Sequence, residues 1–337
     1  MNVYRPLDRE TLLSRLREPK DTLILFHRNP DADAIGSAFA LKEILAALGS
    51  RAWCVCGQEI PANLRFLCDM EQESVLPGSI PFDFRSQRIV SVDVASPAQL
   101  GDLEALYGDR VDLMIDHHGK GTPFADHFIQ PLAAATGEIL FDLATDLSAQ
   151  GRNLFTPTLC RKLYAAISAD TGCFRFSNVT PETHRRAAVL LTHGIDSAAI
   201  NHQLFESRSF RQIKAEGAGI ERLGIYRDGK VAAIAFPYEL KQSMELSEDE
   251  LGTLIDVARS VEGVLVAFVV RQPDPEPVFR VSMRSACDFD VSAVCANFGG
   301  GGHRRAAGCT FHADTIDEAL DLLLSAIDSE NGKSYQL

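Results

Sequence analysis

Short apolar runs of this chain end in aspartate and histidine side chains at several separate places. The run 22–26 leads into HRNPDADAIGS at 27–37, the run 89–92 leads into Asp93, and the run 111–115 leads into Asp116-His117-His118. Asp170 follows the apolar helical segment 163–169. In an open sheet of parallel strands, ligands gather at the carboxyl ends of the strands. We therefore expect these side chains, which are far apart in sequence, to meet at one edge of a sheet.

Strands that alternate with helical segments are typical of βαβ units and a parallel sheet. The pattern predicts strands at 22–26, 51–55, 88–94 and 111–115, with a first helix at about 34–48 that ends at Gly49. A second strand-rich segment has strands at 231–236, 264–270 and 278–283 and a closing helix at 316–327. We predict an α/β fold with three parts. These are an N-terminal domain at 1–195 with a mostly parallel sheet flanked by helices, a linker helix at 196–224, and a smaller C-terminal α/β domain at 225–330.

The chain length, net charge and cysteine pattern exclude some classes of function. The 337 residues are enough for two domains with separate cores. A formal net charge of -13 argues against tight binding to long duplex DNA, which needs many Lys and Arg side chains. The net charge does not exclude small phosphorylated substrates, because bound divalent cations can supply positive charge locally. The eight cysteines form no zinc-ribbon pattern, no signal peptide is evident, and no apolar stretch reaches the ~20 residues of a membrane span. We expect free thiols and a cytoplasmic location.

The first candidate ligands are His27, Asp31 and Asp33, in the pattern HxxxDxD. In an irregular loop, two carboxylates at this spacing can reach two neighbouring cations. Oxygen ligands combined with imidazole suit Mn²⁺, with Mg²⁺, Co²⁺ and Fe²⁺ as alternatives. Asp31 and Asp33 are equally compatible with a helix N-terminus, where acidic side chains complement the helix dipole.

Asp116, His117 and His118 are more specific, because burying a carboxylate and two imidazoles is costly unless they bind a metal or one another. For this segment, a solvated turn is the alternative. Asp93 or Asp170 taken alone does not distinguish a metal ligand from an ordinary residue at the end of a strand or helix. Together the set fits two cations about 3.5–4 Å apart that share a carboxylate, an arrangement used for phosphoryl displacement. The sequence thus predicts metal-assisted hydrolysis.

A second motif, FGGGGHRRAAG, occupies 298–308. Its four consecutive glycines would let the backbone approach an anion, with the amide groups exposed as a nest; a flexible linker is the alternative. Arg284 ends a strand of the same segment and could bind a phosphate through two hydrogen bonds. A solvated strand-end charge explains Arg284 equally well.

In combination, HRNPDADAIGS, SVD, IDHHG, SADTGCF and FGGGGHRRAAG resemble the signature motifs of the DHH/DHHA1 phosphoesterases. The order and spacing are similar to those of the bifunctional oligoribonuclease/pAp phosphatases, the nanoRNase type, over about residues 23–326. The resemblance implies an N-terminal DHH domain, a linker and a smaller C-terminal DHHA1 domain, with the active site in the cleft between the two domains.

The resemblance also implies roles for individual residues. One cation would be held by His27, Asp31 and Asp93, and the other by Asp33, Asp93, His117 and Asp170, so that Asp93 bridges them. Two catalytic residues would lie beside the cations: Asp116, which orients an imidazole, and His118, which faces the substrate. The phosphates and terminal nucleotide of the substrate would be held by Arg284, Gly299, Gly300, Gly301, Gly302 and His303.

The implied function is Mn²⁺-dependent hydrolysis of short oligoribonucleotides and of 3′-phosphoadenosine 5′-phosphate, by in-line attack of water at two metal ions. Hydrolysis of cyclic di-AMP or of its linear product pApA is the alternative within the family. A nucleotide-binding module without turnover is the alternative from another class. The expected partners are short single-stranded RNA and small nucleotides, not long duplexes or a membrane. A homodimer is compatible with the family.

Overall fold

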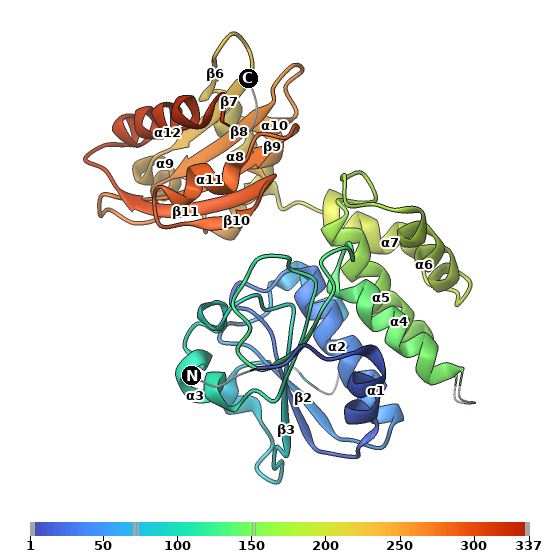
Figure 1. Cartoon of the computed structure of the whole chain (residues 1–337). Coiled ribbons are helices and arrows are strands. Elements are labelled where there is room, and N and C mark those ends of the chain that lie inside the picture. The colour runs from blue at the N-terminus through green and yellow to red at the C-terminus, as the bar shows by residue number, and fades with distance from the viewer. Residues whose placement is uncertain (1–3, 70–71, 73, 150, 152, 334–337) are drawn as a thin grey trace. The chain divides into compact units, whose positions relative to one another are not determined.

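The structure, a computed structural model, describes residues 4–69, 72, 74–149, 151 and 153–333. These residues form two compact units that divide between Ser207 and Arg208. Figure 1 shows that each unit contains a sheet accompanied by helices. The predicted α/β class is confirmed. The first three residues of the predicted domain 1–195 lie outside the described part of the chain.

The first unit is built on a parallel sheet with the strand order β2-β1-β3-β4-β5. Its strands are β1 (Thr22–Leu25), β2 (Ala52–Val55), β3 (Arg88–Val92), β4 (Leu113–Asp116) and β5 (Asp126–Ile129). Every residue of β1, β3 and β4 is buried, as expected for a parallel sheet covered on both faces. The edge strand β5 was not predicted, because only two of its four residues are apolar and three are half-buried.

Helices of this unit pack closely because small residues lie at their contacts. Their bounds are α1 (Arg9–Arg17), α2 (Ala32–Ala47), α3 (Leu103–Tyr107), α4 (Thr136–Ser148), α5 (Pro157–Asp170), α6 (Pro181–Leu191) and α7 (Ser197–Asn201). A Cβ atom on Gly36 of α2 would lie 2.7 Å from the Lys162 carbonyl oxygen of α5. Only glycine therefore permits this approach of α2 to α5.

Lys162 is an almost fully buried charge within this packing, with 1% of its surface exposed. Its Nζ lies 3.1 Å from Glu43 Oε2 and 2.5 Å from Asp69 Oδ1. The ion pairs tie α5 to α2 and to the loop after a short 3₁₀-helix at Ala62–Leu67.

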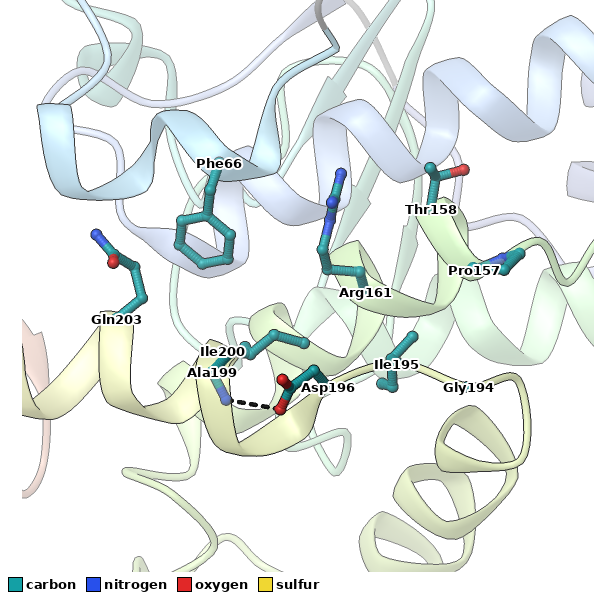
Figure 2. A pocket seen from close by; sticks show the side chains of 10 residues that line it. All are labelled: Phe66, Pro157, Thr158, Arg161, Gly194, Ile195, Asp196, Ala199, Ile200 and Gln203. Atoms are coloured by element: carbon teal, nitrogen blue, oxygen red, sulfur yellow. Dashed lines mark hydrogen bonds between the residues drawn. The ribbon is translucent and has the colours of Figure 1, made fainter.

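The segment predicted as one linker helix contains two helices. The first, α7, continues into a π-helical turn at His202–Glu206, and α8 then covers Phe210–Ile220. Ser209 interrupts the helical run, because its extended backbone and its hydroxyl cap α8 by accepting a hydrogen bond from the Gln212 amide. A cavity of about 440 Å³ lies where α7 approaches α5, and Figure 2 shows Arg161 and Ile200 among its lining side chains.

The second unit contains a mixed sheet with the strand order β10-β11-β9-β8-β7-β6. The strands are β6 (Leu223–Tyr226), β7 (Val231–Phe236), β8 (Val266–Arg271), β9 (Val278–Ser285), β10 (Gly301–His303) and β11 (Ala306–His312). Helices α11 (Val291–Ala296) and α12 (Ile316–Glu330) contribute to one buried cluster, and α8 and α10 (Leu254–Arg259) contribute to another. A short helix, α9 (Tyr238–Ser243), follows β7.

Within the described ranges, no helix is both long and apolar enough to cross a membrane. All eight cysteines are free thiols, as expected.

Candidate metal centre

The predicted ligands of the first unit come together where the parallel strands end. His27 follows β1, Asp93 follows β3, and Asp116 is the last residue of β4. The amino end of α2 and the carboxyl end of α5 add further carboxylates at the same edge. Ligand atoms lie within 4.8 Å of one another in three groups: His27, Asp31 and Asp93; Asp93, His117 and His118; and Asp33, His117 and Asp170.

Asp93 belongs to two of these groups, and its two carboxylate oxygens face different imidazoles. Oδ2 lies 3.6 Å from His27 Nε2, whereas Oδ1 lies 3.6 Å from His117 Nε2 and 3.7 Å from His118 Nδ1. Thr136 Oγ1 donates a 2.9 Å hydrogen bond to Oδ1. The Asp93 backbone has φ +58°, a left-handed conformation that Asp tolerates better than most residues. The side chain is therefore placed so that each oxygen can serve a different ion.

Backbone carbonyls set the orientation of two imidazoles. His27 Nδ1 lies 2.9 Å from the Arg28 carbonyl oxygen, and His117 Nδ1 lies 3.2 Å from the Ala133 carbonyl oxygen. A carbonyl can only accept, so in the neutral ring the proton is on Nδ1. Nε2 is then left as a lone-pair donor. In His117 it points toward Asp170 Oδ2 at 3.2 Å.

Asp33 is fully buried, and a hydroxyl of α2 and two amides at the N-terminus of α4 donate to its carboxylate. It lies in the first turn of α2, where Ser37 Oγ donates to Oδ1 at 2.9 Å. The first amides of α4 also point at it, Thr136 N at 2.7 Å and Gly137 N at 3.0 Å. Of the two placements considered for Asp31 and Asp33, the helix N-terminus is therefore the one that the structure has. Asp31 caps α2 by accepting from the Ala34 amide, while its Oδ2 lies 3.7 Å from His27 Nε2.

Asp116 orients His118 in this arrangement. Its Oδ1 accepts from the His117 amide at 2.8 Å and lies 2.7 Å from His118 Nδ1. Its Oδ2 is buried, and within the described residues no hydrogen-bond partner contacts that atom. His118 Nδ1 also lies 3.7 Å from Asp93 Oδ1. Asp116 and His118 therefore lie at the edge of the group of candidate metal ligands.

Crowding of carboxylates shifts the pKa values of the whole cluster. Burial raises the pKa of Asp33 well above its usual range, and the charges of Asp93 and Asp170 raise it further. Burial likewise raises the pKa of Asp170 to about 6, although a hydrogen bond from His117 opposes this. Burial alone would lower the pKa of His117, but its bond to Asp170 and the charges of Asp33 and Asp93 raise it to about 11.

The pKa of His27 is raised in the same way by Asp31 and Asp93 against the effect of burial. Burial would also raise the pKa of Asp93, but His27 and His117 hold it below its usual value. Among the described residues, the cationic partners of Asp33, Asp93 and Asp170 are imidazoles. Buried carboxylates without Lys or Arg partners, arranged with imidazole lone pairs, fit a pair of divalent cations.

In the second unit, the predicted substrate-binding residues gather near one end of the sheet. Pairing of β10, β11 and β9 places His303 opposite Ala306 and Ala306 opposite Arg284. Directly opposed residues point to the same face, so only a small side chain separates His303 from Arg284. Burial lowers the pKa of the Arg284 guanidinium.

The glycine run differs from the expected nest of free amides. The Gly299 and Gly300 amides donate to carbonyls of α11, namely those of Ala296 and Cys295. Gly301 and Gly302 belong to β10, which is the edge strand of its sheet. A Cβ on Gly300 would lie 2.2 Å from the Gly308 carbonyl oxygen, so close packing accounts for this glycine.

Comparison with known proteins identifies the family. The DHH family N-terminal domain matches residues 21–167, and the DHHA1 domain matches residues 230–329. The bifunctional oligoribonuclease and PAP phosphatase NrnA of Thermus thermophilus is 30% identical over 91% of this chain and 89% of its own length. The chain belongs to the DHH family of phosphoesterases. The resemblance inferred from the motifs is confirmed, and so is the class of enzyme, a hydrolase of phosphoester bonds.

Other DHH relatives differ in length. NrnA of Bacillus subtilis is 25% identical over 92% of this chain and 96% of its own length. The cyclic-di-AMP phosphodiesterase PdeA of Listeria monocytogenes is 26% identical, but this chain covers only 49% of it. A crystal structure of an exopolyphosphatase-related protein from Bacteroides fragilis has a TM-score of 0.85 at 21% identity, covering 95% of both chains. This last similarity shows a shared fold.

Several residues that support the candidate metal ligands were not predicted from the sequence. Ser37, Thr136 and Gly137 hold Asp33, and Asn178 Nδ2 donates to both the Ala134 and Asp170 carbonyl oxygens at 3.1 Å. Glycine is itself a signal at position 137, because a glycine in the first turn of a helix often permits the close approach of a neighbour. A Cβ there would lie 2.6 Å from the Ala166 Cβ. No sequence pattern pointed to Asn178.

Proposed function

We propose that this phosphoesterase hydrolyses short oligoribonucleotides and 3′-phosphoadenosine 5′-phosphate with two Mn²⁺ ions. The observation that carries the proposal is the Asp93 carboxylate, whose two oxygens face separate imidazole-containing groups. One ion would be held by His27, Asp31 and Asp93, and the other by Asp33, Asp93, His117 and Asp170. When bound, such ions would activate a water molecule and offset charge on the phosphoryl oxygens.

The residues of the chain have separate tasks in this scheme. His27 and His117 keep a proton on Nδ1 through their carbonyl contacts and present Nε2. His118, oriented by Asp116, would donate a hydrogen bond to the reacting phosphoryl group or the leaving oxygen. In the second unit, Arg284, His303 and the glycines 299–302 would hold the phosphates and the terminal nucleotide. With the Gly299 and Gly300 amides engaged and one amide of Gly301 and Gly302 directed at β11, only the other amide would contact the substrate.

The substrate class is supported by the similarity to the relatives reported above. NrnA of Thermus thermophilus is 30% identical to this chain, whereas the cyclic-di-AMP phosphodiesterase PdeA is 26% identical. Hydrolysis of pApA or cyclic di-AMP therefore stays the second candidate. A binding module without turnover is disfavoured by the complete set of ligands. Homodimerisation and the cytoplasmic location stay predictions.

A kinetic panel tests the proposal. Purified protein is incubated with di- to pentaribonucleotides, 3′-phosphoadenosine 5′-phosphate, pApA and cyclic di-AMP, with Mn²⁺ or with EDTA. We expect Mn²⁺-dependent turnover of the short oligoribonucleotides and the bisphosphate, and slower turnover of cyclic di-AMP. Turnover of cyclic di-AMP alone would favour the second candidate. Tight nucleotide binding without hydrolysis in Mn²⁺ would refute the catalytic role.

A further inference from the structure

The chain makes a strained turn directly after Asp170, one of the proposed metal ligands. Gly172, Cys173 and Phe174 have φ angles of +55°, +60° and +60°. This left-handed conformation is unfavourable for a bulky residue such as Phe174, and strain of this kind is concentrated at functional sites. The turn brings the chain back to its starting point, because the side chain of Asn178 contacts the backbone of Asp170.

The side-chain amide of Asn178 joins two segments of the candidate metal centre. Its Nδ2 donates one hydrogen bond to the Asp170 carbonyl oxygen at the end of α5 and one to the Ala134 carbonyl oxygen before α4, both of 3.1 Å. A carbonyl oxygen can only accept, so the nitrogen of the amide must face both atoms, and each of its two protons has one acceptor. Removing this one nitrogen therefore removes both bonds.

These two segments support the four ligands proposed for the second ion. Asp170 is itself one of the ligands and ends the first segment. The turn at residues 133–137 supports the other three through a carbonyl oxygen, a hydroxyl and two amides, which contact His117, Asp93 and Asp33 respectively. Because Asn178 bonds both segments, it sets how far Asp170 lies from the other three ligands.

The first ion, proposed at His27, Asp31 and Asp93, has other supports. His27 contacts a carbonyl oxygen of its own segment, and Asp31 caps α2. Within the described residues, Asp93 is the one ligand of the first ion that the turn at 133–137 contacts. The two hydrogen bonds of Asn178 therefore act mainly on the second ion.

We propose that Asn178 is a positioning residue that holds the ligands of the second ion at the separation that one cation requires. His117 Nε2 lies 3.2 Å from Asp170 Oδ2. Adjacent ligands of an octahedral cation with bonds of about 2.1 Å lie roughly 3 Å apart, so this separation suits a shared ion. The inference rests on the proposed function, because it assumes that His117 and Asp170 bind the same ion. A residue that only capped α5 would affect stability without distinguishing between the two ions.

Two variants test the role of Asn178, and a third serves as the control. Asn178→Ala removes both hydrogen bonds, and Asn178→Asp removes them with little change of shape, since a carboxylate has no proton to donate. Asn178 is exposed, so both variants should fold. Asn201→Ala is the control, because Asn201 also makes two hydrogen bonds to α5, with Tyr164 and Ser168, neither of which involves the turn at 133–137.

Mn²⁺ binding to the full chain is measured by electron-paramagnetic-resonance titration, which should resolve two sites in the unsubstituted protein. We expect both Asn178 variants to weaken one site about tenfold, a loss typical of residues that orient metal ligands, and to leave the other within about twofold. Asn201→Ala should leave both affinities unchanged. Unchanged affinities in the Asn178 variants, or equal losses at both sites, would overturn the proposal.

The weakened site is identified in a double variant. Asp170→Asn removes a ligand of the second ion alone, so the site that stays tight in this variant is the first. Adding Asn178→Ala to Asp170→Asn should leave the affinity of that site within about twofold. A larger loss would mean that Asn178 acts on the first ion, which contradicts the proposal.

A measurement without metal separates this inference from the proposed function. In EDTA, hydrogen exchange of the Thr136 and Gly137 amides should be several-fold faster in Asn178→Ala than in Asn201→Ala, because the turn that carries these amides is released. Equal exchange rates would overturn the positioning role, whether or not Mn²⁺ binds. If the unsubstituted chain binds no Mn²⁺, the proposed function fails, and the exchange rates still decide whether Asn178 positions the turn.

Discussion

Replacing Thr136 with valine should weaken the binding of Mn²⁺ while leaving the fold intact. Thr136 is fully buried at the start of α4, and its Oγ1 donates to Asp93 Oδ1 at 2.9 Å. Valine keeps the branched shape and the backbone amide, which still donates to Asp33 Oδ2. The substitution therefore removes a single hydrogen bond to the carboxylate that we propose as the bridge.

The size of the effect follows from the charge on that carboxylate. A hydrogen bond to a charged group contributes about 1.5–3 kcal/mol. At about 1.4 kcal/mol per factor of ten, this corresponds to a loss of roughly 10- to 100-fold in Mn²⁺ affinity. Replacing a residue that orients a metal ligand typically costs about the same.

Calorimetric or electron-paramagnetic-resonance titration with Mn²⁺ measures the dissociation constant. Thr145→Val is the matched control, because Thr145 lies on the same helix and its Oγ1 donates only to the Phe141 carbonyl oxygen. Thermal unfolding in EDTA reports any structural damage separately. If Thr136→Val binds Mn²⁺ as tightly as Thr145→Val, the bond to Asp93 has no role in holding the ions and the bridge assignment is refuted.

Three further predictions follow from the same contacts. Asp93→Ala should abolish hydrolysis of every substrate in the panel, because both ions lose a ligand, and near-normal turnover would contradict the shared carboxylate. In metal-free protein, Asp170 keeps its proton up to a pKa of about 6 instead of the usual 3.8, so stability should fall as pH rises between these values. At about 1.36 kcal/mol per pH unit, the free energy of unfolding should fall by on the order of 3 kcal/mol. Asp170→Asn, unfolded in EDTA, should show a weaker dependence of stability on pH, and a dependence identical to that of the unsubstituted protein would contradict the raised pKa. Lys162→Met should lower the free energy of unfolding by about 1.5–3 kcal/mol without changing Mn²⁺ affinity, because hydrogen bonds to charged groups are lost while Glu43 keeps Thr158 and Asp69 keeps Lys42 as partners. Unchanged stability would mean that the ion pairs of Lys162 contribute nothing.

Local sequence patterns were enough to place several strands and the residues at their ends. Parallel strands are buried on both faces, so β1 and β3 appear as mostly apolar runs, and the side chain after each run must lie at the carboxyl edge. His27, Asp93 and Asp116 were placed in this way. The family was also readable from its motifs. The edge strand β5 was not, because four residues of mixed polarity, three of them half-buried, give no comparable signal.

The contacts that support the metal-ligand cluster come from distant segments and were not predictable from local patterns. Thr136 and Gly137 lie about a hundred residues from Asp33, and nothing local marks their amides as its partners. The glycine run was misjudged for the same reason, since the Gly299 and Gly300 amides are taken by the end of α11. Local pattern fixes where a polar side chain enters the fold, because burial of the strand beside it is a local property. Which donor meets that side chain depends on helices that arrive from distant parts of the chain, and this depends on packing.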